Sequence, residues 1–529
     1  SQTPPEGVSG PLVDVGRGTD AELSDQILRG AILLLDWDTE EGWLGLQEFG
    51  CKAVIFVGDR PASGAQARKK FLTVPANVPR FYLPAQDGAA VHSAIGQTVT
   101  ITCVMDWKPA SSKNVLARLT EGNPTPGTPP EDCTPVIFHA YYDCVSVTPT
   151  LAPGAEQACG AATLLELARY IRGLPQPPSR PIYALFTGAH GQHMTGMTKF
   201  VRKVVDGLNR GWPDAERQSL AARMGRPGVF VGLDLSSRSD RMGLFCTGGF
   251  RFQTEAQVRP KFSTLAIQLD NFARSYMTNY QDPNARESTP FVDCVNLTLG
   301  RAWWSYFPYR AGFESELPTM AGLPGVTLST IDDRRRLVDT PDDTLANLDL
   351  GLLARQVRRE EGERVGLANF ALAFAYWKGP FVSSPLEDKM RGVQGRVVWL
   401  DSKTDYTPNQ GLTGAVVALK TYRNDKQIVG MRASPVVLTD RDGAFRFDGL
   451  IDLTANPAFD RVGVEAYGTA TRRFLEDNHA AAAEYQVAMS RNGGEPPKIE
   501  EDGSILFAID QAHPQEQPFS TSIVNPVQY

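Results

Sequence analysis

Apolar and polar positions in the first part of the chain follow the pattern of a small α/β unit. Residues 31–35 and 53–57 are continuous apolar runs of strand length, and residues 99–104 alternate between apolar and polar side chains. Between the first two runs, residues 40–49 carry Trp, Leu and Phe side chains at helical spacing. The pattern predicts a separate α/β domain over residues 20–108.

The middle of the chain alternates buried-strand patterns with helical patterns, as in a doubly wound fold. The predicted strands are residues 134–140, 181–186, 228–235 and 325–329. The predicted helices are residues 161–173 and 197–205, with one or two more over residues 345–377. We therefore expect a mixed or parallel sheet flanked by helices over residues 109–380.

Past residue 380, the pattern changes to short strands. The predicted strands are residues 393–400, 414–421, 434–439 and 444–447. Asp442-Gly443 is a hairpin signal, so we expect the last two strands to pair, with Phe445 and Phe447 on one buried face. The spacing predicts a β-sandwich over residues 390–470. Residues 471–529, polar and interrupted by proline, are predicted to be a tail with a helical stretch near 474–489.

Composition and charge narrow the class of protein. The chain has 529 residues and a net charge of -7. This length predicts about three domains, and the mild charge gives no reason to expect nucleic acid as a partner. No apolar run reaches the roughly 20 residues that a membrane-spanning helix needs. The polar, proline-rich first residues are similar to what remains after a signal peptide is removed, which predicts an extracytoplasmic location: secreted, periplasmic or cell-surface.

Both end units resemble known domains that lack catalytic signatures. The order GAILLLD, LQEFGCKAVIFVGD and VPRFYLP resembles the protease-associated (PA) domain, a lid-like insert found beside peptidase domains. The segments GLTGAVVALK and VVLTDRDGAFRFDGL resemble the carboxypeptidase regulatory-like domain, a transthyretin-like β-sandwich.

Polar residues follow each predicted strand of the middle segment, where function collects in open α/β sheets. The segments are Tyr141-Tyr142-Asp143, Gly154-Ala155-Glu156-Gln157, Ala189-His190, Asp234 and residues 339–344. Their order resembles the M28 metallopeptidases over most of residues 114–380. That family shows His-x-Asp, Gly-Ala-x-Asp-Asn, Glu-Glu, Asp and a final His before a Thr-Pro-x-Asp-Thr-like stretch. The resemblance implies a zinc-peptidase-like fold, in which two bridged zinc ions hold a water and a carboxylate takes its proton.

The chain departs from this family at most of the positions that carry the chemistry. Tyr141 stands at the first His, Gln157 at the bridging Asp, Ala189 at the catalytic Glu, His190 at the ligand Glu and Asp339 at the last His, whereas Asp143 and Asp234 match. Alanine accepts no proton, and a neutral amide does not balance the charge of two zinc ions. The sequence therefore predicts no catalytic residues, no dinuclear zinc site and no ordinary aminopeptidase activity.

Two interpretations of the remaining polar residues stay open. His190, Asp234 and Asp339 either hold a single zinc, iron or manganese ion or hydrogen-bond around an inactive pocket. Glu156 replaces the bridging carboxylate if the loop shifts by one residue. His139, two residues before Tyr141, is expected to be a buried, hydrogen-bonded histidine rather than a ligand.

The sequence also singles out two cysteines, two charged runs and an aromatic loop. Cys144 and Cys159 are unreactive thiols, a disulfide, or a site whose nucleophile would use His190 as base. The runs 332–336 and 355–364 are predicted to be solvated faces. An aromatic loop is predicted either to pack in the core or to bind sugar or peptide; its residues are Trp303, Trp304, Tyr306, Phe307 and Tyr309.

The leading functional prediction is an exported scaffold or binding protein that keeps a peptidase fold without catalysis and contacts an unidentified protein or peptide. It needs no cofactor, and the alternative is one zinc ion. The competing predictions are an active metallo-aminopeptidase with an altered, single-metal site and a structural subunit of a cell-envelope assembly. Fold resemblance by itself does not choose among them.

Overall fold

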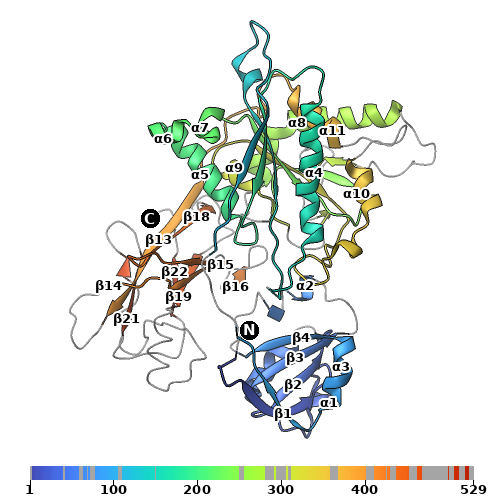
Figure 1. Cartoon of the computed structure of the whole chain (residues 1–529), viewed down its shortest axis with the longest axis vertical. Helices are drawn as coiled ribbons and strands as arrows, with labels where there is room; N and C mark the ends of the chain where they lie inside the picture. Colours follow the sequence, from blue (N-terminus) through green and yellow to red (C-terminus); the bar gives the residue numbers. More distant parts are fainter. Residues whose placement is uncertain are drawn as a thin grey trace.

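The structure is a computed structural model of the whole chain (Figure 1). It describes residues 3–39, 42–58, 64–67, 70–71, 78–104, 110–148, 150–249, 255–279, 291–293, 305–307, 311–357, 367–400, 410–423, 426–428, 436–451, 461–467, 498–499, 505–510 and 519–523. The described segments form an N-terminal sheet, a central sheet with helices on both faces, and a pair of C-terminal sheets (Figure 1).

The N-terminal unit contains a sheet of order β4-β3-β2-β1-β5, in which only β5 is antiparallel to its neighbour. Its strands are β1 (Val8–Asp14), β2 (Ile32–Asp36), β3 (Ala53–Gly58), β4 (Arg80–Pro84) and β5 (Thr98–Ile101). Its helices are α1 (Asp20–Leu23), η1 (Gly42–Phe49), α2 (Gly64–Ala67) and α3 (Ala85–His92). The helix expected at residues 40–49 is a 3-10 helix. The sheet begins with β1, so the expected start at residue 20 leaves out one of its strands.

The central unit is a mixed sheet of order β11-β10-β12-β9-β7-β8-β6, as the fold-class prediction required. Its strands are β6 (Val115–Thr120), β7 (Val136–Tyr141), β8 (Ile182–Thr187), β9 (Val229–Asp234), β10 (Met242–Phe245), β11 (Phe291–Asp293) and β12 (Gly325–Thr330). The neighbours β12, β9, β7 and β8 run parallel, and β6 is antiparallel to β8. The carboxyl ends of these four parallel strands therefore meet at one edge.

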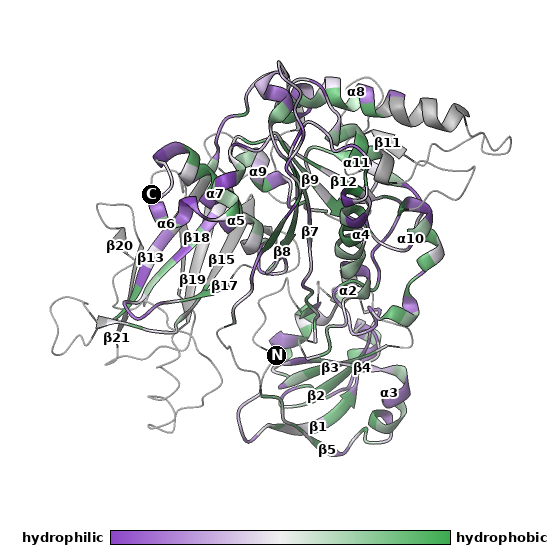
Figure 2. Cartoon of the chain, turned by 45° about the horizontal axis from the view of Figure 1, so that its top comes forward, coloured by the Kyte–Doolittle hydropathy of each residue, from purple (hydrophilic) through white to green (hydrophobic). Residues whose placement is uncertain are grey.

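Helices cover both faces of the central sheet (Figures 1 and 2). The longer helices are α4 (Ala155–Arg172), α5 (Thr195–Arg210), α8 (Glu255–Asn279), α10 (Leu350–Val357) and α11 (Leu367–Ala375). The shorter ones are η3 (Pro130–Cys133), α6 (Asp214–Arg217), α7 (Leu220–Met224), α9 (Glu316–Met320) and η5 (Leu345–Asn347). Because β7 alternates, Phe138 packs in one core with Leu164 of α4 and Phe374 of α11, while Ile137 packs in another with Phe200 of α5. Figure 2 shows the strands between these layers mostly in the hydrophobic colour.

The C-terminal unit has two sheets, β14-β13-β21-β20 with β18 on β13, and β16-β15-β19-β22 with β17 on β15. The first contains β13 (Met390–Leu400), β14 (Gln410–Gly411), β18 (Ala444–Ile451), β20 (Lys498–Ile499) and β21 (Ile505–Asp510). The second contains β15 (Val416–Arg423), β16 (Lys426–Ile428), β17 (Val436–Leu438), β19 (Arg461–Tyr467) and β22 (Phe519–Ile523).

Two predictions about this unit are wrong. The turn at Asp442-Gly443 does not close a hairpin, because β17 pairs with β15 in one sheet and β18 pairs with β13 in the other. The segment expected to be a tail supplies β21, parallel to β13, and β22, antiparallel to β19. The helical stretch expected near residues 474–489 lies outside the described residues.

The inward orientation of the two phenylalanines on β18 is confirmed. Phe445 and Phe447 are each 5% exposed, and their rings lie 6.0 Å apart between centroids. They belong to the same apolar cluster as Phe200 of α5 and Met320 of α9. The C-terminal sheets and the central unit therefore share one hydrophobic core.

Candidate functional site

The polar residues predicted to follow the central strands lie at the edge where those strands end. Tyr141 ends β7 and Asp234 ends β9, and the Tyr141 hydroxyl donates a hydrogen bond of 3.3 Å to Asp234 Oδ1. The Tyr141 ring stacks on the His190 ring at 3.7 Å between centroids. The backbone N–H of His190 donates to both Asp143 carboxylate oxygens at 3.0 Å. Contacts therefore join Tyr141, Asp143, His190 and Asp234 into one group.

Glu314, a residue that the sequence pattern did not single out, is the centre of this group. Its Oε1 lies 3.0 Å from His190 Nδ1, and its Oε2 accepts a 2.6 Å hydrogen bond from Thr187 Oγ1 at the end of β8. His139 Nδ1 lies 3.6 Å from Oε2, so His139 is the buried, partnered histidine that was expected. Burial opposes ionisation of the Glu314 carboxyl, but hydrogen bonds from His139 and His190 lower its pKa to about 2.

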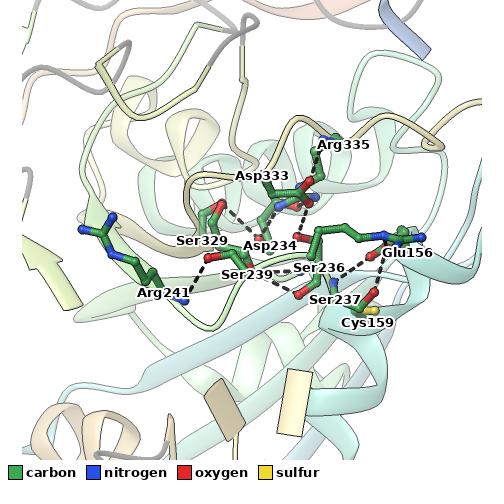
Figure 3. A network of polar contacts seen from close by, with 12 residues as sticks. Glu156, Cys159, Asp234, Ser236, Ser237, Ser239, Arg241, Ser329, Asp333 and Arg335 are labelled. Carbon is green, nitrogen blue, oxygen red and sulfur yellow. Dashed lines mark hydrogen bonds and ion pairs between the residues drawn. The ribbon is translucent and has the colours of Figure 1, made fainter. Parts of the chain in front are cut away.

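The carboxylate of Asp234 is compensated by an arginine (Figure 3). Arg335 Nη1 lies 3.1 Å from Asp234 Oδ1, and Arg335 Nη2 donates to the Asp234 carbonyl at 2.8 Å. Arg335 comes from the charged run 332–336, which was predicted to be a solvated face. That prediction is wrong for Asp333 and Arg335, which are buried and face inward between exposed neighbours.

Glu156, the alternative candidate for a bridging carboxylate, contacts the loop that follows β9. Its Oε2 accepts the backbone N–H of Ser237 at 2.7 Å, and its Oε1 accepts Ser237 Oγ at 2.7 Å and Arg238 Nε at 3.1 Å (Figure 3). These bonds tie the start of α4 to the loop that follows β9. The Glu156 carboxylate therefore bonds to residues other than Gln157. The Gln157 side chain donates from Nε2 to the Val145 carbonyl.

Asp339 lies with Gln157 near the start of α4. Gln157 Nε2 lies 3.4 Å from Asp339 Oδ1, and Asp339 is fully buried with φ of 68°. Its neighbour Asp343 accepts the Glu156 N–H at 2.7 Å through Oδ1 and the Ala155 N–H through its carbonyl. Burial, together with the charges of Glu156 and Asp339, raises the pKa of Asp343 to about 6. This cap from a distant loop explains why α4 begins before residue 161.

Cys144 and Cys159 do not form a disulfide in the structure, so the disulfide interpretation is wrong. Burial raises the pKa of Cys159 to about 12, which keeps this thiol protonated near neutral pH. Cys144 Sγ donates to the Ala152 carbonyl at 3.1 Å.

Tyr306 and Phe307 of the aromatic loop pack around Phe245, with Phe307 in the core and Tyr306 partly buried. Trp303, Trp304 and Tyr309 lie outside the described residues, as does most of the charged run 355–364.

The arrangement does not fit a metal site built from His190, Asp234 and Asp339. His190 Nδ1 faces Glu314, Asp234 faces Arg335 and Tyr141, and Asp339 faces Gln157. In the part of the chain that the structure describes, no three His, Cys, Asp or Glu side chains form a group that could hold a metal ion. A small cavity lies at this edge, and its lining includes His139, Tyr141, His190, Asp234 and Glu314.

The fold and the edge define an α/β protein with a mixed sheet between helices and a polar group at the carboxyl ends of its parallel strands. Residues 114–287 match Peptidase family M28. This matched segment runs from the start of β6 through α8, so it contains the polar group described above except Glu314, Arg335 and residues 339–343.

Solved structures with a similar arrangement include proteins of low sequence identity. An aminopeptidase from Aneurinibacillus sp. strain AM-1 is 18% identical, with 73% of this chain and 79% of that chain covered and a TM-score of 0.33. A peptidase M28 precursor from Shewanella amazonensis SB2B is 14% identical, with 73% and 77% covered and a TM-score of 0.41. The gamma-secretase component nicastrin is 12% identical, with 72% of each chain covered and a TM-score of 0.42.

No curated protein matches the chain. Among the described helices, none combines the length and the hydropathy that crossing a bilayer requires.

Proposed function

We propose that this chain is a peptidase-like protein without peptidase catalysis and that it acts as an exported scaffold or binding protein for a protein or peptide. The main support for the proposal is the identity of the two residues, Ala189 and His190, that come shortly after β8. Ala189 stands where the resemblance implies the general base, and the next side chain, His190, contacts the buried carboxylate of Glu314. Neither residue offers a free carboxylate that could take a proton from a bound water.

The charge balance of the edge supports the same proposal. Gln157 stands at the expected bridging position and contacts a carboxylate with its amide instead of supplying a negative charge. A general base contributes about 10²–10⁴-fold to rate, and loss of a bridging carboxylate also weakens charge stabilisation at the developing oxyanion. Loss of either one alone leaves a poor enzyme.

An active metallo-aminopeptidase with an altered, single-metal site is the competing proposal. The observation that favours it is the cavity beside His190, Asp234 and Glu314, because titratable groups around a concave site are typical of catalysis. A structural subunit of a cell-envelope assembly is a third proposal, and the mass of the purified protein in solution separates it from a monomeric binding protein.

The test is turnover of aminoacyl chromogenic substrates by the full chain, with and without added zinc. We expect no zinc-dependent turnover by the wild type. His190→Ala and Asp234→Ala are the informative variants, and Asp206→Ala, in a partly exposed pair with Arg202 on α5, is the matched control. Robust turnover that needs zinc, persists in the control and disappears in both informative variants would overturn the proposal.

A further inference from the structure

The negative charge of Asp234 is largely buried and needs a compensating group. Asp234 ends β9, and its side chain is only 20% exposed. The serines that follow it, Ser236 and Ser237, are fully buried. A carboxylate in such a place needs a cation or several hydrogen-bond donors, because desolvation penalises its charged form. In the M28-like arrangement implied by the sequence, a metal ion would supply that charge.

Here the cation is a side chain of the same protein. The Arg335 guanidinium contacts both the carboxylate and the backbone carbonyl of Asp234, at 3.1 and 2.8 Å, and Arg335 Nε lies 3.5 Å from Asp333 Oδ2. Arg335 is 5% exposed. A guanidinium keeps its charge at any physiological pH and presents its donors in a rigid fork. It therefore compensates two carboxylates without taking up a metal ion.

Several contacts hold Arg335 in this position (Figure 3). Its backbone N–H donates to Asp333 Oδ1 at 2.8 Å, and Asp333 Oδ2 accepts Ser236 Oγ at 2.5 Å. The backbone of Arg335 has φ of 46°, a left-handed conformation that side chains with a Cβ rarely adopt. Such a conformation persists where the surrounding contacts over-determine it. The guanidinium is therefore a fixed part of the edge.

We propose that Arg335 is a built-in counter-cation for Asp234 and that it makes this carboxylate unavailable as a metal ligand. This inference rests on the proposed loss of metal chemistry and names the group that takes over the charge. The position next to Asp234 then becomes a site for a small planar cation of the guanidinium type once the arginine side chain is removed.

The experiment is thermal unfolding of the full chain with Arg335→Met, in which the charge is lost and the apolar stem is kept. We expect the melting temperature to fall by roughly 5–10 °C. Millimolar guanidinium chloride should raise the melting temperature of Arg335→Met but not that of the wild type, and sodium chloride at the same concentration should raise neither. The matched control is Arg241→Met, in a partly exposed pair with Asp332, which should change little and show no rescue.

Two further variants keep the test decisive. Asp234→Asn/Arg335→Met should recover part of the loss, because the uncompensated carboxylate is also removed. If Arg335→Met does not fold, Arg335→Lys, which keeps the charge but not the fork, should melt between the wild type and the double variant. The inference fails if guanidinium raises the melting temperature of the wild type and of Arg335→Met alike, or if zinc stabilises the wild type and Asp234→Asn abolishes that effect. Rescue by guanidinium needs no catalysis, so this inference and the proposed function can fail separately.

Discussion

Glu314 and Asp343 are both buried carboxyl groups at the edge of the central sheet, and their pKa values are shifted in opposite directions from the ordinary values. The pKa of Glu314 falls to about 2, because His139 and His190 donate to it and overcome its burial. The pKa of Asp343 rises to about 6, because burial dominates and its nearest charges, Glu156 and Asp339, are also negative. The difference shows that partners, rather than burial, decide whether a carboxylate at this edge is stable.

The carboxylates at this edge fall into two groups that differ in the same way. Around β7, β8 and β9, the carboxylates of Glu314 and Asp234 face imidazole and guanidinium groups of the chain itself. At the start of α4, the Asp343 carboxylate receives hydrogen bonds from the Glu156 backbone N–H and from the Gln157 side chain, but it forms no ion pair with a described side chain. We expect removal of a carboxylate to be costly in the first group and favourable in the second.

The largest expected effect follows from Glu314→Ala. Removing this carboxylate leaves His139 and His190 without their buried acceptor, and breaking such a pair costs about 3–5 kcal/mol. The measurement is the free energy of unfolding in urea near neutral pH. Glu166→Ala, in an exposed pair with Arg169 on α4, is the control and should change stability by less than about 0.5 kcal/mol. Equal effects of the two variants would contradict the assignment of Glu314 as the centre of the group.

Acid unfolding sharpens this prediction. The folded-state pKa of Glu314 lies below its ordinary value of 4.5, so its contribution is present above pH 4.5 and is lost as the pH falls toward about 2. The wild type should therefore lose stability across that window more steeply than Glu314→Ala. Parallel curves for the two proteins would show that Glu314 is not held ionised.

The next effect has the opposite sign. The pKa of Asp343 is raised from 3.8 to about 6, so its stabilising protonated form is complete below pH 3.8 and is lost as the pH rises to about 6. At about 1.4 kcal/mol per pKa unit, the charged form costs on the order of 3 kcal/mol at neutral pH. Asp343→Asn keeps an acceptor for the Glu156 N–H and removes that charge. We expect it to stabilise the protein at pH 7.5 and to have little effect at pH 3.5, as measured by urea unfolding at both values.

A variant without this pH dependence would contradict the account of Asp343. Asp342→Asn, at the neighbouring half-buried position, is the matched control and should give the same result at both pH values. Destabilisation by Asp343→Asn at pH 7.5 would mean that the negative charge itself holds the start of α4.

The smallest effect is expected for Tyr141→Phe. This change removes the hydroxyl that donates to Asp234 at 3.3 Å and leaves the ring stacked on His190. Because Arg335 still compensates Asp234, the loss should be about 0.5–1.5 kcal/mol. Tyr170→Phe, at an exposed position on α4, is the control. A loss as large as that of Glu314→Ala would place the charge balance of Asp234 on Tyr141 instead of Arg335.

The sequence predicted the central strands well, because β7, β8, β9 and β12 are buried apolar runs that short-range patterns identify. It did not predict the pairing of β17 and β18, because the turn at Asp442-Gly443 has the same residues whether it joins strands within a sheet or between sheets. The registers of β21 and β22 depend on contacts between distant segments. Local patterns contain no information about such contacts.

The site was predicted in part for a related reason. Tyr141, Asp143, His190 and Asp234 lie at or just after the ends of strands, so their positions along the chain were enough to place them at one edge. Glu314 and Arg335 come from loops, and only tertiary contacts bring them to Asp234 and His190. The sequence contains no signal that singles out Arg335, because residues 332–336 are all charged and their alternation of exposed and buried positions appears only in the structure.

We infer that the charges at this edge are balanced by groups of the chain itself, not by metal ions. The most direct test is metal analysis of the full chain after incubation with zinc and exhaustive dialysis. We expect well below one equivalent of retained zinc per chain, with no change in His190→Ala or Asp234→Asn. One or two retained equivalents of zinc that disappear in those two variants would contradict this inference and would show that the edge binds metal ions.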